Sequence, residues 1–177
     1  REIHELLLSS RKTLAEFLKT DIDDIVFIPN ATTGVNIVAR SINLQPGEVL
    51  ITTNQEYGAC NRTWNFLSRQ NNFSINQAKL STPFESKEDL IAEICSFYNP
   101  KTKALFISHI SSTTSAIFPI KEICLQAREA GILTIIDGAH APGQIDLNIE
   151  ELGCDFYIGN LHKWLCAPKG SAFLYAR

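Results

Sequence analysis

The amine of one lysine lies between side chains that could make it reactive. Lys163 stands between His162 and Trp164, in a segment with few other charges. When an amine is partly removed from water its pKa falls, and the uncharged form can attack a carbonyl group to form a Schiff base. Because a lone lysine is usually a solvated surface charge, this hypothesis depends on the residues that surround it.

An aspartate at the end of an apolar run could supply a partner charge. Residues 132–136 are mostly apolar, Asp137 follows them, and then come small residues and His140. Glycine and alanine leave room for a ligand to approach the backbone closely. Since carboxylates are rarely buried without a partner, Asp137 is either a capping residue or the stabiliser of a buried cation.

Two other segments could bind an anion and a planar ring. Residues 29–34, Pro-Asn-Ala-Thr-Thr-Gly, open a predicted helix, and free N–H groups and hydroxyls at a helix start form an anion site. An ordinary N-cap has the same residue types. Tyr57, with Gly58 beside it, could lie over a planar ligand, or it could be a partly exposed tyrosine at a strand end.

A polar segment at residues 109–115 carries six hydroxyl or imidazole side chains in seven positions. Burying such groups is unfavourable unless they form hydrogen bonds. The segment is therefore either a polar surface loop or a set of donors directed at the substituents of a bound ring.

These segments follow predicted strands, and the strands define the fold. The first predicted helix spans residues 2–19, and a buried strand is expected after it. The strand candidates are residues 25–28, 48–53, 73–80, 104–108, 132–137, 155–158 and 171–175. Several are continuous apolar runs separated by helices, as is typical of strands covered on both faces. We predict an α/β three-layer sandwich with a mainly parallel sheet of about seven strands, one edge of which is antiparallel because no helix of normal length separates the last two.

Together these parts match the requirements of one cofactor. An anion site, an aromatic ring, an aspartate and a lysine follow one another at successive strand ends, where ligands of such sheets bind. Pyridoxal phosphate requires an anion site, a ring face, a carboxylate for its pyridinium nitrogen and a lysine. The chain has neither the G-x-G-x-x-G nor the P-loop pattern, so a Rossmann-type nucleotide binder is a weaker alternative.

The motifs around these residues resemble those of the class V aminotransferases, which are fold type I pyridoxal-phosphate enzymes. The strongest pointers are residues 137–140, Asp-Gly-Ala-His, followed later by His162 and Lys163. Residues 159–165 and 30–34 are most similar to the isopenicillin N epimerase-like branch. The resemblance covers nearly the whole chain and implies a large domain like that of aspartate aminotransferase.

The resemblance implies a role for each of these positions. Lys163 would carry the cofactor and later move the Cα proton of an amino-acid substrate. Asp137 would pair with the pyridine nitrogen and keep it protonated. The remaining cofactor-binding positions would be Ala31, Thr32, Thr33 and His162 for the phosphate, Tyr57 for the ring face, and Ser112 and His140 near the ring hydroxyl. The last two differ from the Asn and Gln of the cysteine desulfurase relatives.

The resemblance also implies an enzyme that acts at the Cα of an amino acid. Transamination, epimerisation and elimination share one carbanion, so these residues do not separate them. A cysteine desulfurase or selenocysteine lyase is the first alternative, and it would need a reactive cysteine beyond this chain. A non-catalytic α/β remnant or interaction module that kept the motifs is the alternative of another class.

Composition narrows the partners and the location. The net charge is −3 without a basic cluster, so a nucleic-acid partner is not expected, and no stretch has the length and apolarity of a membrane span. The five cysteines form no C-x-x-C pair and no zinc spacing, so we expect no metal and reduced thiols in a cytoplasmic protein. We expect residues 1–177 to be one domain, the pyridoxal-phosphate-binding large domain of a homodimeric protein, as a fragment without the family's small C-terminal domain.

Overall fold

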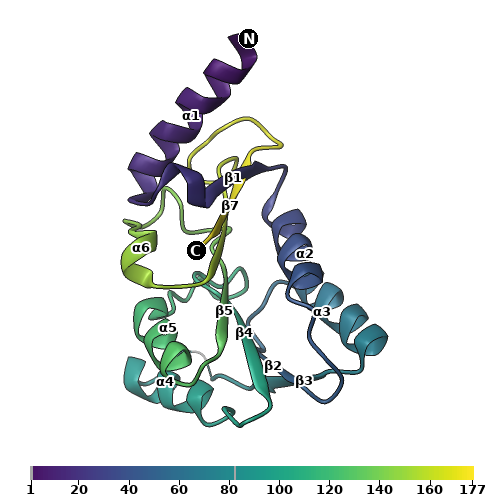
Figure 1. The fold of residues 1–177 in the computed structure, drawn as a ribbon. Coiled ribbons are helices and arrows are strands. Elements are labelled where there is room, and N and C mark those ends of the chain that lie inside the picture. The colour runs from purple at the N-terminus through teal and green to yellow at the C-terminus, as the bar shows by residue number, and fades with distance from the viewer. Residues whose placement is uncertain (1, 82) are drawn as a thin grey trace.

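Seven strands form one sheet in a computed structural model that describes residues 2–81 and 83–177 (Figure 1). The strands are β1 (Ile25–Ile28), β2 (Val49–Thr53), β3 (Ser74–Ala78), β4 (Thr102–Ser108), β5 (Leu133–Asp137), β6 (Phe156–Asn160) and β7 (Ala172–Ala176). Their order across the sheet is β1-β7-β6-β5-β4-β2-β3. All of the predicted strands are therefore confirmed, with their ends shifted by two residues at most.

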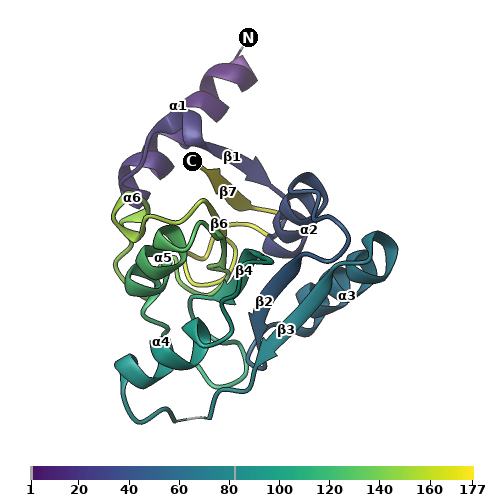
Figure 2. The ribbon, with the colours of Figure 1, turned by 60° about the horizontal axis from the view of Figure 1, so that its bottom comes forward.

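Helices cover both faces of the sheet (Figure 2). One face carries α1 (Glu2–Leu18), α4 (Lys87–Cys95), α5 (Ile120–Glu129) and α6 (Ile149–Leu152). The other face carries α2 (Ala31–Ser41) and α3 (Gly58–Asn71). A short 3-10 helix, Ile22–Asp24, joins α1 to β1. The predicted α/β three-layer sandwich is confirmed.

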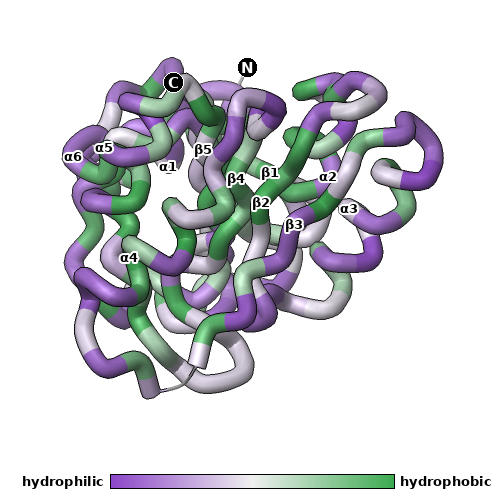
Figure 3. Tube along the Cα trace, turned by 90° about the horizontal axis from the view of Figure 1, so that it is seen from below, coloured by the Kyte–Doolittle hydropathy of each residue, from purple (hydrophilic) through white to green (hydrophobic). Residues whose placement is uncertain are grey.

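The strand β4 shows why the apolar runs are continuous. Leu105 and Ile107 belong to the core on the α4 and α5 side, whereas Ala104 and Phe106 belong to the core on the α2 and α3 side. All of these side chains are fully buried, because each face of the strand meets a layer of helices. Figure 3 shows hydrophobic residues along β2 and β4 in the interior and many hydrophilic residues on α3 at the outside.

Strand directions place several strand ends at one edge of the sheet. The strands β2 to β6 are parallel, and β7 runs antiparallel to both β6 and β1. The antiparallel strand predicted at the edge of the sheet therefore lies one position inside it, and β1 forms the edge. This position also corrects the expectation that β1 is buried, because Val26 and Phe27 are 48% and 38% exposed. An edge strand has a neighbour on one side only.

The helix α1 projects away from the rest of the molecule (Figure 1). The helix predicted at residues 2–19 is confirmed, but its buried residues, Leu14, Ala15 and Leu18, all lie near its end. Ile3 and Leu6 are 74% and 67% exposed. Helical spacing of apolar residues therefore identified the helix without identifying its buried side. In the described ranges, no helix has both the length and the apolar character needed to cross a membrane.

A glycine brings the start of α2 close to the sheet. A Cβ atom at Gly34 would lie 2.5 Å from Ile28 Cδ1 and 2.6 Å from Ile158 Cγ2. Real Cβ atoms essentially never approach so closely, so a larger residue would push α2 away from β1 and β6. The first turn of α2 therefore lies beside the carboxyl end of β6.

Candidate active site

A pocket lies at the carboxyl ends of β2, β4 and β5, beside the segment that follows β6. It is lined by Tyr57, Ser108, Ile110, Ser112, Asp137, Ala139, His140 and Lys163. The pocket brings together residues predicted for a cofactor site from four strand ends, namely Tyr57, Ser112, Asp137, His140 and Lys163. The other predicted residues, Ala31, Thr32, Thr33 and His162, lie outside this lining.

Asp137, the last residue of β5, is a buried carboxylate with an incomplete set of partners. Its Oδ1 accepts the N–H of Ala139 at 3.0 Å, and its Oδ2 accepts the thiol of Cys60 at 3.6 Å. A thiol is a weak donor. Burial raises the pKa of Asp137, whereas the Ala139 amide and the charge of Lys163 act in the opposite direction. A cationic N–H group in the pocket would therefore find an acceptor at Oδ2.

Lys163 is half-buried and contacts His140. The Lys163 Nζ lies 3.0 Å from His140 Nε2, and the indole N–H of Trp164 donates to His140 Nδ1 at 3.2 Å. Burial lowers the pKa of Lys163, and the negative charge of Asp137 opposes this shift. Burial and the charge of Lys163 also lower the pKa of His140. The amine is therefore partly desolvated, as a nucleophilic lysine requires.

The remaining predicted pocket residues, Tyr57 and Ser112, are exposed at the surface of the pocket. Tyr57 is the N-cap of α3 and is 50% exposed. Among the hydroxyl and imidazole groups of residues 109–115, Ser112 is the one that lines the pocket. His109 is instead buried, and its Nδ1 lies 2.8 Å from the hydroxyl of Tyr157. The set of ring-directed donors expected from this segment is thus reduced to Ser112.

Most N–H groups at the start of α2 already donate hydrogen bonds to the protein's own side chains. The N–H of Ala31 donates to Asn160 Oδ1 at 2.8 Å. The N–H and the hydroxyl of Thr33 donate to Asn30 Oδ1 at 2.8 Å and 3.1 Å. Within residues 2–81 and 83–177, the Thr32 amide is the one of these three N–H groups without an acceptor. Of the anion site expected here, the amide and the hydroxyl of Thr32 are therefore the groups left free to bind an anion.

His162 contacts the residue directly before β7. Its Nδ1 lies 2.9 Å from the carbonyl oxygen of Ser171. A carbonyl oxygen only accepts, so Nδ1 carries a proton, and Nε2 is the ring nitrogen that this contact leaves available.

Sequence reasoning assigned no role to three buried residues of the site. Cys60 donates to Asp137, and Asn160 holds the start of α2. Glu56 is 5% exposed, and it accepts the N–H and hydroxyl of Ser108 at 2.8 Å and 2.6 Å. Burial is the main cause that raises the pKa of Glu56 to about 7. The available signal was a carboxylate directly before Tyr57 at a strand end, where an unpaired charge is expensive to bury.

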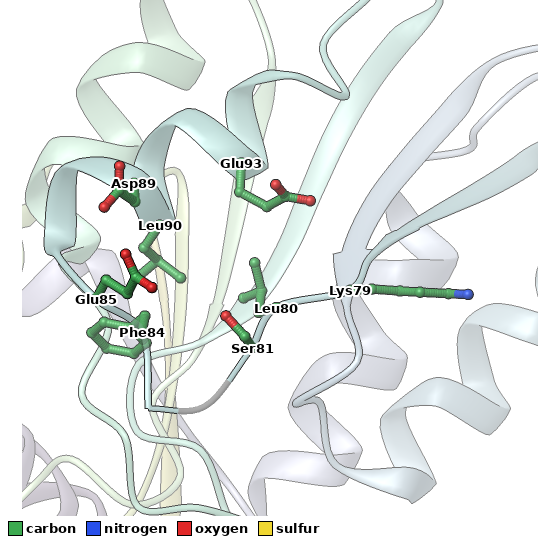
Figure 4. Close-up of a pocket in the computed structure, with 8 residues that line it drawn as sticks. All are labelled: Lys79, Leu80, Ser81, Phe84, Glu85, Asp89, Leu90 and Glu93. Carbon is green, nitrogen blue, oxygen red and sulfur yellow. The ribbon is translucent and has the colours of Figure 1, made fainter.

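A second pocket lies apart from these residues, between the segment after β3 and α4 (Figure 4). It is lined by Lys79, Leu80, Ser81, Phe84, Glu85, Asp89, Leu90 and Glu93. Lys79 extends away from the three carboxylates in Figure 4. None of the residues predicted for a site belongs to this lining, so this pocket is not part of the candidate site.

The sequence is similar to curated enzymes over nearly its full length. The family model described as Aminotransferase class-V matches residues 1–177. The chain is 38% identical to isopenicillin N epimerase from Streptomyces clavuligerus over 176 residues, which cover 99% of this chain and 44% of that protein. It is 35% identical to isopenicillin N epimerase from Amycolatopsis lactamdurans, covering 99% and 45%. It is 32% identical to cysteine desulfurase from Serratia proteamaculans, covering 94% and 41%.

Solved structures share the fold. A complex of the cystine C–S lyase C-DES with its product cysteine persulfide superposes with a TM-score of 0.94 at 25% identity, covering 99% of this chain and 47% of that one. The Escherichia coli cysteine desulfurase CsdA superposes with a TM-score of 0.89 at 22% identity, covering 99% and 44%. The chain thus spans less than half the length of the relatives it matches.

Proposed function

The chain belongs to the class V aminotransferase family, and we propose that it forms the pyridoxal-phosphate-binding large domain of an enzyme acting at the Cα of an amino acid. One observation carries the proposal. The half-buried amine of Lys163 shares a pocket with the buried carboxylate of Asp137. A nucleophilic amine and a carboxylate with one oxygen bound only weakly, here by a thiol, are the two groups that this cofactor needs most.

The residues of the pocket fit the cofactor. Asp137 Oδ2 has a weak thiol donor as its partner, so it would accept the protonated ring nitrogen without first breaking a strong hydrogen bond. The exposed ring of Tyr57 lines the pocket, where it would border a face of a planar ring, and the small Ala139 lines it as well. Ser112 and His140 supply polar groups for the ring hydroxyl.

When bound, pyridoxal phosphate supplies an electron-withdrawing ring that accepts the electron pair left by a broken bond at Cα. Asp137 would hold a proton on the ring nitrogen and so preserve that capacity. Lys163 would attach the cofactor and afterwards, as the free amine, take the proton from Cα. Its lowered pKa suits both roles, since each requires the uncharged amine.

The phosphate would bind at the start of α2. The positive end of the helix and the free amide and hydroxyl of Thr32 support this assignment, and Nε2 of His162 is the nitrogen of that ring left available for a ligand. Ala31 and Thr33 would contribute only if the phosphate replaced their present acceptors on Asn160 and Asn30. We therefore propose Thr32 as the main ligand.

The identity to two isopenicillin N epimerases favours epimerisation or a related reaction at Cα. The cysteine desulfurase alternative is supported by 32% identity to such an enzyme. Burial raises the pKa of Cys60, Cys124 and Cys154, so these thiols are not activated as nucleophiles. Burial also raises the pKa of Cys95, and Cys166 is not among the residues that line the pocket, so a desulfurase would depend on a cysteine outside residues 1–177.

Deuterium exchange tests the proposed reaction. The full-length protein with pyridoxal phosphate would be incubated with individual L-amino acids in D2O, with Lys163→Ala as the control variant. We expect deuterium at Cα of at least one amino acid, and no exchange with the variant, because Lys163 is the base. Sulfide release from cysteine would select the desulfurase alternative. A cofactor-loaded protein that exchanges no amino acid would contradict the proposal.

Three further expectations from the sequence stay predictions. These are a homodimer of the full-length protein, a cytoplasmic location, and the absence of a nucleic-acid partner. The thiols of all five cysteines are free, which supports a reducing compartment. Sedimentation of the full-length protein would test the dimer.

A further inference from the structure

Three side chains form a continuous hydrogen-bonded chain that ends at the reactive amine. The indole N–H of Trp164 lies 3.2 Å from His140 Nδ1, and His140 Nε2 lies 3.0 Å from Lys163 Nζ. Trp164 is adjacent to Lys163 in sequence, while His140 lies in the loop after β5. The His140 imidazole therefore bridges Trp164 and Lys163, two adjacent residues of the segment that follows β6.

The hydrogen atoms shared by Trp164, His140 and Lys163 can be arranged in one way only. An indole nitrogen is a donor and never an acceptor, so His140 Nδ1 must accept and carries no proton. A neutral imidazole then carries its proton on Nε2. That N–H points at Lys163 Nζ, which can accept it only through the lone pair of an uncharged amine. An ammonium group would place two donors against each other.

Close backbone packing keeps the tryptophan beside the histidine. Gly143, in the same loop as His140, has a φ of +87°, and a Cβ there would lie 2.8 Å from the Trp164 carbonyl carbon. The rings of His140 and Trp164 have centroids 6.4 Å apart. The loop after β5 and the segment after β6 are thus held together at this point by more than the hydrogen bond.

We propose that Trp164 is a positioning residue that fixes the tautomer of His140, so that the Nε2–H donates to Lys163 Nζ and stabilises its uncharged form. This inference extends the proposed function, since an uncharged amine is what both the capture of an aldehyde and the removal of a Cα proton require. Burial lowers the pKa of Lys163 in the same direction.

Other groups that face the lysine act differently. Asp137 at the end of β5 and Cys60 on α3 favour the charged amine, and Tyr57, which lines the same pocket as Lys163, is half exposed. The His140 contact opposes Asp137. Burial also favours the uncharged amine, so the balance of burial and the His140 contact against Asp137 sets the fraction of amine that is ready to react.

The test measures the basicity of Lys163 without cofactor. Cofactor-free full-length protein would be labelled with trace acetic anhydride across a pH series, and the Lys163 peptide would be quantified by mass spectrometry. In Trp164→Phe, which keeps an aromatic ring and removes the N–H, we expect the Lys163 pKa to rise by about one unit, so that labelling near neutral pH falls about tenfold. An unchanged pKa would overturn the proposal.

A double variant separates the tautomer from a change in burial. In a His140→Ala background there is no tautomer to fix, so Trp164→Phe should leave the Lys163 pKa almost unchanged. An equal shift with and without His140 would mean that the indole acts by excluding water, and would overturn the proposal. Since this readout uses no cofactor, it can fail while cofactor binding succeeds, or succeed while cofactor binding fails.

Nitrogen NMR supplies a direct second readout. With 15N-labelled histidine, the His140 signals of the cofactor-free protein should show the Nε2–H tautomer, and Trp164→Phe should shift them toward Nδ1–H. A wild-type protein with the Nδ1–H tautomer would contradict the inference.

Discussion

The two sides of the candidate site differ in how far the protein satisfies its own polar groups. On the lysine side, formed by Asp137, His140 and Lys163, the Oδ2 of the buried carboxylate has, among the described residues, one donor, a thiol at 3.6 Å. On the helix side, residues 30–33, the amides of Ala31 and Thr33 already donate to side-chain oxygens at 2.8 Å. The lysine side therefore has a polar atom that a ligand would satisfy, whereas most polar groups of the helix side already have protein partners.

This difference indicates what a cofactor would contribute on each side. A ring cation would gain binding energy from Asp137, because a buried carboxylate oxygen with a weak thiol donor is poorly solvated. A phosphate would gain less at α2, since it would compete with Asn30 and Asn160 for two of the three N–H groups. The lysine side should accordingly dominate activity, and the helix side should dominate stability.

The largest effect is expected from Asp137→Asn. The amide keeps an oxygen for the Ala139 N–H but cannot keep the ring nitrogen protonated, so Cα exchange should fall by about 100- to 1,000-fold. Urea unfolding should show equal or greater stability, because burial raises the pKa of this carboxyl. Exchange within threefold of the wild type would break the contrast between the two sides.

Glu56→Gln tests how a buried carboxyl near the lysine side makes stability depend on pH. Burial raises the pKa of Glu56 from 4.5 to about 7, so the folded protein binds its proton more tightly than the unfolded chain does. The contribution of Glu56 to the free energy of unfolding is therefore fully present below pH 4.5. It falls as the pH rises to about 7, by on the order of 3 kcal/mol, and then levels off. The variant should flatten that fall in urea titrations at several pH values. An unchanged pH profile in Glu56→Gln would assign the dependence to another group.

On the helix side, Asn160→Ala should mainly reduce stability. It leaves the buried N–H of Ala31 without an acceptor, which costs about 1–3 kcal/mol. Asn160→Asp keeps an acceptor at the positive end of α2 and should lose less. If urea unfolding gave both variants wild-type stability, the bond between β6 and α2 would not matter.

The smallest effect is expected from Thr32→Val. In a Lys163→Ala background, where binding is not covalent, loss of the hydroxyl should weaken pyridoxal phosphate by about fivefold, or about 1 kcal/mol, in a fluorescence titration. Thr33→Val is the matched control, since its hydroxyl already donates to Asn30. Equal losses in the two variants would show that the phosphate displaces Asn30, and would remove the proposed preference for Thr32.

Local patterns predicted the seven strands, the first helix and most of the pocket. Continuous apolar runs predicted the strands, and because parallel strands share a carboxyl edge, Asp137 and Lys163 could be expected near each other. The polar residue after each strand was therefore informative without knowledge of the strand order. The same reasoning placed Tyr57, Ser112 and His140 near these two residues, and all three line the pocket.

Contacts between distant segments could not be predicted in this way. The bond from Ala31 to Asn160 joins residues 129 positions apart, and the thiol of Cys60 reaches Asp137 across 77. No periodicity encodes such pairs, because they depend on which strands become neighbours. The same limit applies to β1, whose position at the sheet edge exposes Val26 and Phe27.

Covalent capture of the cofactor tests the central claim most directly. Pyridoxal phosphate would be added to the cofactor-free full-length protein, the visible absorbance recorded, and the sample reduced with borohydride and digested for mass spectrometry. We predict a visible band and, after reduction, the cofactor attached to Lys163, with neither in Lys163→Ala. Attachment to another lysine, or a folded full-length protein without any visible band, would contradict the account.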